Sequence, residues 1–400
     1  MRAVCWYGPR DLRVQEVADP AIVQPHDAIV RVTLSAICGS DLHLYNGFMP
    51  GMRKGDILGH EFMGEVIEVG SAVEHIKPAD RVVVMCGISC GRCWFCKHDL
   101  FSACDNSNPS PSADVMETMY GHAGAALFGY SHVMGGYSGG QAELVRVPFA
   151  DVGCLVLPAA PASPTSPASV EAEKVLLVSD ILPTGWMAAE SCGIQPGDIV
   201  AVFGCGPVGQ LSAISALAQG AERVIAIDRV QARLDMAGRN PRVTALDARE
   251  GRLLARLDAL TGGRGPDACI DAVGLEADGD GPAAIYDKVK QKLRAQSDRP
   301  TALRMAIQAC RKGGTVSIPG VYGGLIDKFP MGAAFGKGLT LKMGQTHFHR
   351  YGKPLLDKVL ASELDPSFIV THRVGLDDAP DAYRMFNAKA DGCVKVVMRP

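Results

Sequence analysis

A glycine-rich turn between an apolar strand and a helix restricts the fold of this chain more than any other feature of its sequence. The apolar segment Ile199–Phe203 is followed by the run GCGPVG and then by VGQLSAISALAQ, which has a helical pattern. In this run Gly204 permits a tight turn, Gly206 lets the backbone approach a pyrophosphate, and Gly209 allows helix and strand to pack closely. Asp228 ends the next apolar strand, where a carboxylate can bind ribose hydroxyls. The pattern predicts a parallel, doubly wound sheet that binds a dinucleotide.

The residues around this turn also indicate which dinucleotide binds. The negative charge of Asp228 favours NAD, because the 2′-phosphate of NADP would meet it. Arg229 is adjacent and could offset that preference, so NADP stays open, and a chance glycine turn is the other alternative. The predicted cofactor contacts in this region are Gly204, Gly206, Pro207, Val208, Gly209, Asp228 and Arg229.

A cluster of four cysteines predicts a structural metal site. The run CGRCWFCKHDLFSAC contains Cys90, Cys93, Cys96 and Cys104. Four thiolates at this spacing can close a tetrahedral shell around Zn²⁺ and leave no position open for a substrate. Disulfides and free thiols are alternatives for these residues, and an iron–sulfur cluster is another, because spacing alone does not exclude it. We expect most of the remaining cysteines to be buried, inert thiols.

A second constellation predicts a catalytic metal. Cys38 begins the run CGSDLH, and His60 and Glu61 lie in GHEFMGEV. A thiolate, an imidazole and one further ligand leave a fourth position for water or substrate, which is the arrangement of a catalytic zinc. Such a zinc polarises a substrate oxygen and lowers the pKa of a bound alcohol. Each residue taken singly is more often part of a packed core, but their combination with the four-cysteine cluster favours the metal site.

The order of the expected elements predicts two domains, the first of them discontinuous. A chain of 400 residues is long enough for two domains. Segments rich in β-branched residues extend from the start of the chain to Phe149. Strands and helices alternate after Asp180, and the tail from Thr346 is expected to fold back on the first domain. The predicted domains are residues 1–183 completed by 347–400, and residues 184–346, with the Pro/Ala/Ser-rich run Ala159–Ser169 as a surface loop or linker.

The composition excludes several classes of protein. Hydrophobic residues make up 47% and charged residues 21% of the chain, as in an ordinary globular protein. A net charge of −3 without a long basic run argues against a nucleic-acid or membrane partner. The N-terminal run MRAVCWYGPRDLRV lacks the apolar core of a signal peptide, and no stretch resembles a membrane span. We therefore expect a cytoplasmic protein whose 13 cysteines are thiols or metal ligands.

These motifs together resemble the zinc-containing medium-chain alcohol dehydrogenase family. The resemblance covers nearly the whole chain and rests on GHEFMGEVIEVG, the cysteine cluster, GCGPVG and GGRGPDACIDAVG. Within the family, the run LVSDILPTGWMAAE makes the chain most similar to the glutathione-independent formaldehyde dehydrogenases and their uncharacterised relatives. The resemblance implies a GroES-like, mainly-β catalytic domain and a Rossmann domain that binds NAD. It also implies hydride transfer between an alcohol or aldehyde and NAD, and a homodimer or homotetramer joined through the cofactor-domain sheets.

The resemblance further implies two zinc sites per chain. Many family members use a cysteine as the third ligand of the catalytic zinc, and here Asp180 stands at the matching position, as in the formaldehyde dehydrogenase subgroup. Cys38, His60 and Asp180 would hold the catalytic zinc, and the four-cysteine cluster would hold the structural one. Asp180 could instead be a helix N-cap, since SDILPTG also suits a helix start. Glu61 would lie just behind the catalytic zinc, as a neighbour or an occasional ligand.

Three further residues take roles from the resemblance. Ser40 matches the family's hydroxyl that touches the substrate oxygen, and His43 matches the end of a proton relay through the cofactor ribose. An imidazole suits this relay because its pKa lies near neutrality. Both residues could also be ordinary polar loop residues. Lys395, in GCVKVV, matches a tail residue that often reaches the cofactor phosphates, with a solvated surface lysine as the alternative.

The substrate is the least constrained part of the prediction. The candidate pocket residues are Phe48, Met49, Trp186 and His347. Their aromatic and thioether side chains favour an apolar pocket for small or aryl alcohols, although each could be plain core.

Three other functions stay open at this point. The first is a formaldehyde dehydrogenase or dismutase whose NAD is held tightly by an insertion within Leu275–Pro300. The second is a polyol or sugar-alcohol dehydrogenase, against which Asp180 argues because a glutamate elsewhere is the expected oxygen ligand there. The third is an NAD(P)H-binding regulatory protein without catalytic zinc, against which the joint presence of Cys38, His60 and Asp180 argues.

Overall fold

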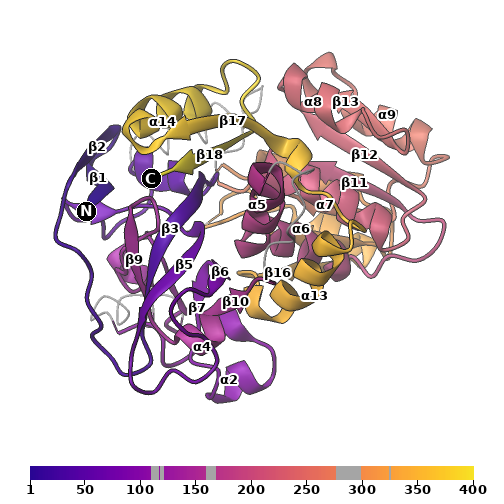
Figure 1. Ribbon diagram of the computed structural model, residues 1–400. Helices are drawn as coiled ribbons and strands as arrows, with labels where there is room; N and C mark the ends of the chain where they lie inside the picture. Colours follow the sequence, from indigo (N-terminus) through magenta and orange to yellow (C-terminus); the bar gives the residue numbers. More distant parts are fainter. Residues whose placement is uncertain (110–116, 118–120, 159–167, 276–298, 324–325) are drawn as a thin grey trace. The chain divides into compact units, whose positions relative to one another are not determined.

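The structure is a computed structural model of the 400-residue chain (Figure 1). It describes residues 1–109, 117, 121–158, 168–275, 299–323 and 326–400. The described chain forms two compact units, the first from Met1–Pro183 with His347–Pro400 and the second from Thr184–Thr346. Residues 159–167 of the predicted loop and 276–298 of the predicted insertion lie outside the described residues, and Ala168 and Ser169 already belong to a helix.

A seven-stranded sheet forms the centre of the first unit. Its strands are β3 (Ala28–Ile37), β5 (Glu61–Val69), β6 (Arg81–Val84), β9 (Leu144–Val147), β10 (Cys154–Val156), β17 (Val370–Gly375) and β18 (Lys395–Arg399). The strand order is β10-β6-β5-β3-β18-β17, and β9 also pairs with β3. The C-terminal strand β18 pairs antiparallel with the end of β3, where Val396 faces Ile37. Val30, Phe62 and Phe128 belong to the buried apolar cluster of this sheet.

Smaller elements complete the first unit. Two further sheets consist of β1 (Arg2–Gly8), β2 (Asp11–Glu16) and β4 (Asp56–Ile57), and of β7 (Gly87–Ile88) and β8 (Ala126–Leu127). The α-helices are α1 (Asp41–Tyr45), α2 (Trp94–Lys97), α4 (Ala150–Gly153), α5 (Ala168–Leu176), α13 (Phe348–Leu360) and α14 (Ala379–Ala388). The 3₁₀ segments are η1 (Phe101–Ala103), η2 (His132–Met134), η3 (Leu177–Ser179), η5 (Ser367–Ile369) and η6 (Leu376–Asp378).

The second unit contains the predicted parallel sheet. Its strands are β11 (Ile199–Phe203), β12 (Arg223–Asp228), β13 (Val243–Asp247), β14 (Ala268–Asp271), β15 (Thr315–Ile318) and β16 (Thr340–Met343). They pair in parallel in the order β13-β12-β11-β14-β15-β16. The direction of progression reverses between β11 and β14, which is the kind of position where open α/β sheets bind ligands.

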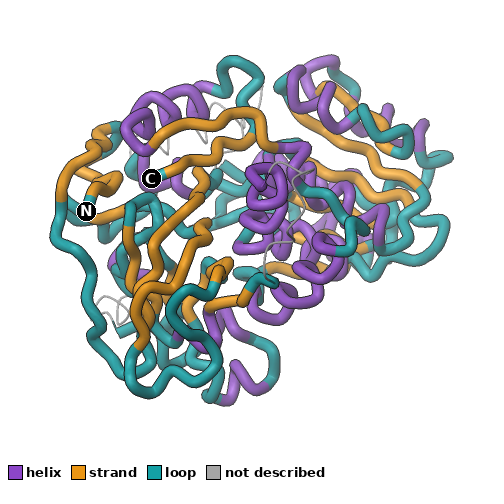
Figure 2. The backbone as a smooth tube through the Cα atoms, viewed as in Figure 1, coloured by secondary structure: helices purple, strands orange, loops and turns teal. Residues whose placement is uncertain are grey.

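Helices surround this sheet (Figure 2). They are α7 (Pro207–Ala218), α8 (Gln231–Ala237), α9 (Leu253–Leu260), α11 (Thr301–Ala309), α12 (Met331–Lys337) and the 3₁₀ segment η4 (Ala248–Glu250). Helix α6 (Ile181–Ser191) begins in the first unit and ends in the second. Successive residues of β11 enter different cores: Val200 clusters with Ala216 of α7, and Ala201 clusters with Ile307 of α11. The sheet is therefore buried on both faces, as expected for a parallel sheet with crossover helices. No described helix is long and apolar enough to cross a membrane.

Candidate metal centres and dinucleotide site

Three turns of the first unit bring together the predicted catalytic metal ligands. Cys38 directly follows β3, His60 directly precedes β5, and Asp180 directly follows η3. Cys38 Sγ and His60 Nε2 each lie 3.3 Å from Asp180 Oδ2. All three side chains are buried, and Glu61 adds a carboxylate oxygen, so that the four donor atoms lie within 4.8 Å of one another.

This donor set fits a zinc ion. Zinc–ligand bonds of about 2.0–2.3 Å in a tetrahedron place neighbouring donors roughly 3.3–3.8 Å apart. The separations of Cys38 and His60 from Asp180 match that range. Burial, followed by the neighbouring Asp180 carboxylate, raises the pKa of the Cys38 thiol to about 11, so a thiolate here requires a compensating positive charge. A divalent cation supplies that charge, and one thiolate with one carboxylate balances Zn²⁺ formally.

A buried hydrogen-bonding network supports these ligands from behind. Asp41 Oδ1 lies 3.2 Å from His60 Nδ1, and Asp41 Oδ2 accepts a hydrogen bond of 2.9 Å from Cys38 N. Gln141 Nε2 lies 3.5 Å from the same carboxylate, and Tyr383 Oη donates to Gln141 Oε1 at 2.9 Å. A carboxylate at the second ring nitrogen fixes the orientation of a metal-binding histidine. Sequence analysis missed Asp41, although its position within CGSDLH, three residues after Cys38, is a usable signal.

The four predicted structural cysteines also converge. Their sulfur atoms lie within 4.8 Å of one another, and Cys93 Sγ is 4.0 Å from Cys104 Sγ. The backbone N–H groups of Arg92 and Cys93 donate to Cys90 Sγ at 3.4 and 3.3 Å. Burial opposes ionisation of Cys90, but these N–H groups outweigh it and lower the pKa of the thiol to about 7. All 13 cysteines are free thiols, so the four cysteines do not form the alternative disulfides. We call the segment Cys90–Cys104 the four-cysteine lobe.

The glycine run forms the turn that its spacing predicts. Gly204 has a φ of +91°, which a residue with a side chain rarely adopts. Gly209 lies so close to the preceding turn that an added Cβ would be 1.8 Å from the carbonyl oxygen of Gly204. Gly206 is the N-cap of α7, and an added Cβ there would have Arg233 Nη1 at 3.5 Å as its nearest neighbour. The helix N-terminus thus has the open backbone surface that a pyrophosphate needs.

Asp228 is anchored beside this helix terminus. Its Oδ2 accepts a hydrogen bond of 2.6 Å from Cys205 N, in the glycine turn itself. Its Oδ1 accepts hydrogen bonds from the backbone N–H groups of Arg229 at 2.6 Å and Val230 at 2.9 Å. Pro207–Gly209 form the first turn of α7. The carboxylate and the helix N-terminus therefore occupy adjacent positions at the carboxyl end of the parallel sheet.

Comparisons with known proteins agree with this arrangement. The family model of the alcohol dehydrogenase GroES-like domain matches residues 24–159, and that of zinc-binding dehydrogenases matches residues 207–280. An uncharacterized zinc-type alcohol dehydrogenase-like protein of Bacillus subtilis is 39% identical to this chain, and the match covers 100% of both proteins. The chain belongs to the zinc-type alcohol dehydrogenase family.

Further relatives confirm the predicted fold class and family. A glutathione-independent formaldehyde dehydrogenase of Pseudomonas aeruginosa is 34% identical, over 97% of this chain and 95% of that protein. The solved structure of the alcohol dehydrogenase TADH from Thermus sp. ATN1 has 32% identity and a TM-score of 0.80, covering 100% of this chain and 99% of that one. The protein is thus a zinc-dependent oxidoreductase with a GroES-like and a Rossmann-type domain.

In this alcohol dehydrogenase, Lys395 lies in a buried ion pair of the first unit. Its side chain is fully buried, and its Nζ donates to Glu61 Oε1 at 2.6 Å and to Ile37 O at 3.0 Å. The alternative of a solvated surface lysine is therefore wrong. The physical reason is the register of β18, whose pairing with the end of β3 brings Lys395 to the strand that leads into Cys38. The contact of Lys395 with the cofactor phosphates stays a prediction.

The two predicted relay residues lie on either side of the start of α1. Ser40 Oγ is 3.2 Å from His60 Nε2, the ring nitrogen that also faces Asp180. His43 is buried within α1, and this burial lowers the pKa of its imidazole to about 4. Tyr130 Oη lies 3.5 Å from His43 Nδ1. Sequence analysis missed this tyrosine, which no motif marked.

The four predicted pocket residues lie in different surroundings. Phe48 and Met49 follow α1 in the first unit and are half-buried. His347 Nδ1 lies 2.8 Å from Ser102 Oγ, on the segment that carries the four-cysteine lobe. Trp186 belongs to the part of α6 in the second unit and is half-buried. The role of each as a substrate contact stays a prediction.

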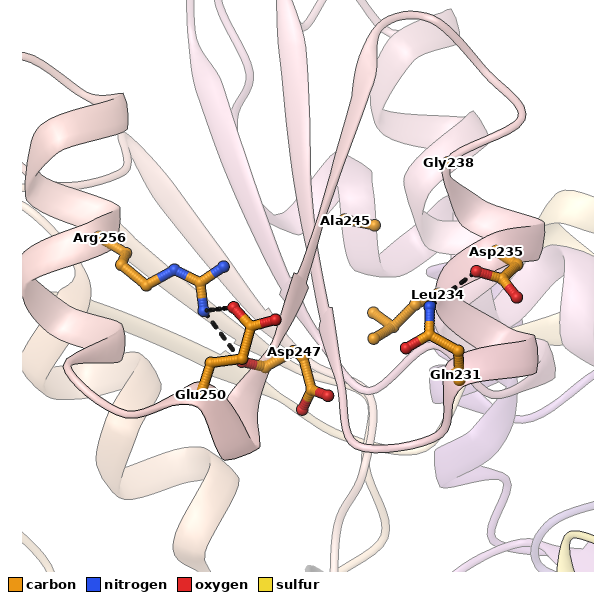
Figure 3. Close-up of a pocket in the computed structure, with 8 residues that line it drawn as sticks. All are labelled: Gln231, Leu234, Asp235, Gly238, Ala245, Asp247, Glu250 and Arg256. Carbon is orange, nitrogen blue, oxygen red and sulfur yellow. Dashed lines mark hydrogen bonds and ion pairs between the residues drawn. The ribbon is translucent and has the colours of Figure 1, made fainter.

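The second unit also has a polar hollow of about 380 Å³ between α8, β13 and α9 (Figure 3). Three carboxylates, those of Asp235, Asp247 and Glu250, line it together with Arg256. The guanidinium of Arg256 is engaged, with its Nη1 2.8 Å from Glu250 Oε2 and 3.1 Å from the carbonyl oxygen of Asp247 (Figure 3). Asp247 in turn pairs with Arg249 at 2.6 Å, so Asp235 is the lining carboxylate without an ion pair among the described residues, and its charge disfavours a phosphate in this hollow.

Proposed function

We propose that this protein is an NAD-dependent dehydrogenase of small alcohols or aldehydes, with a catalytic zinc ion held by Cys38, His60 and Asp180. The observation that carries the proposal is the buried set of a thiol, an imidazole and a carboxylate, in which Cys38 Sγ and His60 Nε2 each lie 3.3 Å from Asp180 Oδ2. When bound, zinc would polarise the substrate oxygen and the nicotinamide would exchange the hydride. The four-cysteine lobe would hold a second, structural zinc, since a four-sulfur shell leaves no open position.

The polar residues beside this donor set support a proton relay. The 3.2 Å separation of Ser40 Oγ from His60 Nε2 supports the proposal that this hydroxyl receives the alcohol proton. Burial of His43 lowers its pKa to about 4, so its imidazole is uncharged at neutral pH and can accept a proton. An uncharged imidazole is what the last member of such a relay requires when an alcohol is oxidised.

We propose NAD rather than NADP as the cofactor. The carboxylate of Asp228 accepts backbone hydrogen bonds from Cys205 and Arg229 and is thereby held beside the N-terminus of α7. A ribose with free hydroxyls can donate to this carboxylate, whereas a 2′-phosphate would bring a second negative charge against it. Arg229 is the residue that would have to compensate in an NADP enzyme. The ratio of kcat/KM for the two cofactors tests this choice directly.

Asp180 favours the formaldehyde dehydrogenase branch over the polyol branch. Its Oδ2 contacts both Cys38 and His60, which supports a ligand role rather than helix capping alone. The relatives at 34% identity include glutathione-independent formaldehyde dehydrogenases, and a formaldehyde dismutase of Pseudomonas putida is 33% identical. A dismutase alternates between oxidation and reduction on one bound NAD. NAD released by acid from freshly purified protein, with no turnover stimulated by added NAD, would favour that alternative.

The edge of the second unit supports assembly with a second copy of the chain. Strand β16 ends the described six-stranded sheet and has unpaired backbone groups on its outer side. Phe335 and Met331 of α12 are 86% and 64% exposed, and Met343 of β16 itself is 66% exposed. Exposed apolar side chains next to a free strand edge are typical of a protein interface. Replacing Phe335 by Ser should lower the molar mass measured by light scattering, whereas an unchanged mass would reject this interface.

One experiment tests the proposed reaction and the metal sites together. NADH formation would be measured with primary, secondary, aryl and polyol alcohols and with formaldehyde, and zinc would be measured on the same sample. We expect two zinc ions per chain, one for each donor cluster. Asp180→Ala should remove one zinc and the activity, whereas the matched variant Cys104→Ser should remove the other zinc. Two zinc ions without activity on any substrate would refute the reaction, and two zinc ions in Asp180→Ala would refute the ligand set.

A further inference from the structure

A buried ion pair lies behind the proposed zinc ligands and has no part in the proposed reaction so far. Lys395 Nζ is 2.6 Å from Glu61 Oε1, and both side chains are 0% exposed. The same ammonium group donates to the carbonyl oxygen of Ile37, the residue before Cys38. Removing two charges from water costs solvation energy, so stabilisation of the fold does not by itself explain why this ion pair is buried. A role in the site itself is therefore the explanation to examine.

Glu61 is close enough to the metal donors to become one of them. It directly follows His60, and one of its carboxylate oxygens lies within 4.8 Å of the donor atoms of Cys38, His60 and Asp180. Its Oε2 is buried and accepts no hydrogen bond from any described residue. Carboxylate oxygens are ordinary zinc ligands, so the Glu61 carboxylate could occupy the fourth position of the shell. Occupation by Glu61 would close the position that an alcohol must take.

The charges at the site explain what prevents this. The Cys38 thiolate and the Asp180 carboxylate already balance Zn²⁺, and Glu61 is a third anion that the ion would attract. The ammonium group of Lys395 provides a competing positive charge on Glu61 Oε1, and its bond to Ile37 O fixes it to β3. We propose that Lys395 is a positioning residue whose ammonium group holds Glu61 out of the zinc shell and thereby keeps the fourth position open for substrate. This inference rests on the proposed catalytic zinc.

Lys395→Met tests the inference, because it removes the charge and keeps an unbranched side chain. The catalytic zinc is first identified as the ion that Asp180→Ala lacks. Its release from each protein to an excess of chelator is then followed, without any substrate. We expect the catalytic zinc to leave Lys395→Met more slowly than the wild type by about tenfold, the scale on which groups next to the ligands alter metal affinity. A purely structural ion pair predicts the opposite, since loosened ligands release the metal faster.

A second measurement reports the open position. The catalytic ion alone is exchanged for Co²⁺, and imidazole is titrated into the protein while the cobalt d–d absorption is recorded. The titration is done above about pH 8.5, where imidazole is neutral, so a change in local charge alone does not account for a change in its affinity. We expect Lys395→Met to bind imidazole about tenfold or more weakly than the wild type. The double variant Glu61→Gln with Lys395→Met should recover wild-type affinity, because it lacks the competing carboxylate.

Two further variants keep the test decisive. Lys395→Arg retains the positive charge and should behave like the wild type in both measurements. If Lys395→Met does not fold, Lys395→Gln carries the same test, since its amide can still donate to Ile37 O without supplying a charge. Wild-type release and imidazole affinity in the uncharged variants would overturn the role of Lys395 and leave the zinc site standing. A wild-type protein without the catalytic zinc would overturn both.

Discussion

Replacement of Gly209 by Ala provides a direct test of the dinucleotide turn. The added Cβ would lie 1.8 Å from the carbonyl oxygen of Gly204 and 2.8 Å from its carbonyl carbon. Cβ atoms essentially never approach another heavy atom more closely than 3.0 Å. Both neighbouring atoms belong to the backbone, so no side chain can rotate away. The turn after β11 and the first turn of α7 must therefore separate.

Two opposing effects determine how much Gly209→Ala lowers the free energy of unfolding. Ala stabilises a helix interior relative to Gly by about 1 kcal/mol, and this is an upper limit for Gly209 in the first turn of α7. Overpacking of a well-packed site costs about 1–3 kcal/mol and occasionally more. The contact with Gly204 is far shorter than the 3.0 Å limit, which places this substitution at the upper end of that range. We expect a net destabilisation of about 2 kcal/mol, equivalent to a decrease in Tm of roughly 4–8 °C for a unit of this size.

The assay compares Gly209→Ala with Gly206→Ala in the protein without cofactor. Gly206 has a φ of −68°, and its added Cβ would meet only Arg233 at 3.5 Å, so its Tm should stay at the wild-type value. The same Cβ would occupy the surface that the pyrophosphate approaches, so NAD should bind more weakly to Gly206→Ala in a fluorescence titration. A wild-type Tm for Gly209→Ala, or wild-type NAD affinity for Gly206→Ala, would refute the geometry of the turn.

Three further outcomes follow from the structure. Cys104→Ser should lower the Tm while the catalytic zinc is retained, as measured by metal analysis and calorimetry on one sample; loss of both ions would contradict independent sites. Asp228→Asn should shift the kcat/KM ratio toward NADP on the order of tenfold, or about 1.4 kcal/mol; an unchanged ratio would exclude a ribose contact. His349 stacks on Phe101, both of its ring nitrogens are buried without a hydrogen-bond partner among the described residues, and burial lowers its pKa to about 4. Because the unfolded imidazole titrates near 6.5, the unfolded state binds more protons between about pH 4 and 6.5, and stability falls by up to about 3 kcal/mol as the pH decreases through that window. His349→Phe should flatten this loss in urea titrations at successive pH values.

The local structure of motifs whose members lie close together along the chain could be predicted from the sequence. The four cysteines occur within fifteen residues, and the glycine run lies directly between its strand and its helix. Their spacing alone states which backbone geometry or metal shell they can form. The doubly wound sheet followed for the same reason, since the alternation of strands and helices is a local property of the sequence. The family resemblance then supplied the proposed third metal ligand, Asp180, which spacing could not have selected.

Contacts between distant residues were beyond the sequence. Lys395 and Glu61 are 334 residues apart, and Tyr383 and Gln141 are 242 residues apart. A lysine in the run GCVKVV has no local feature that distinguishes a buried partner from a phosphate contact. The partner of this lysine depends on which strand β18 pairs with and in which register, and that pairing is determined by the whole sheet. Tyr130 was missed for the same reason, because its approach to His43 depends on a loop between distant strands.

The pairing of β18 with β3 also bears on the order in which the protein can mature. The cysteine lobe and the second unit are each continuous in sequence, so both can fold while the chain is still being synthesised. Strand β18, in contrast, follows all the other described elements in sequence, and it carries the only positive charge that contacts Glu61 among the described hydrogen bonds and ion pairs. Until that strand docks, Glu61 lacks its counter-charge beside Cys38 and His60. If Lys395 restrains Glu61 as we propose, zinc captured before β18 docks would be held without that restraint, and the docking of β18 would then open the position for substrate.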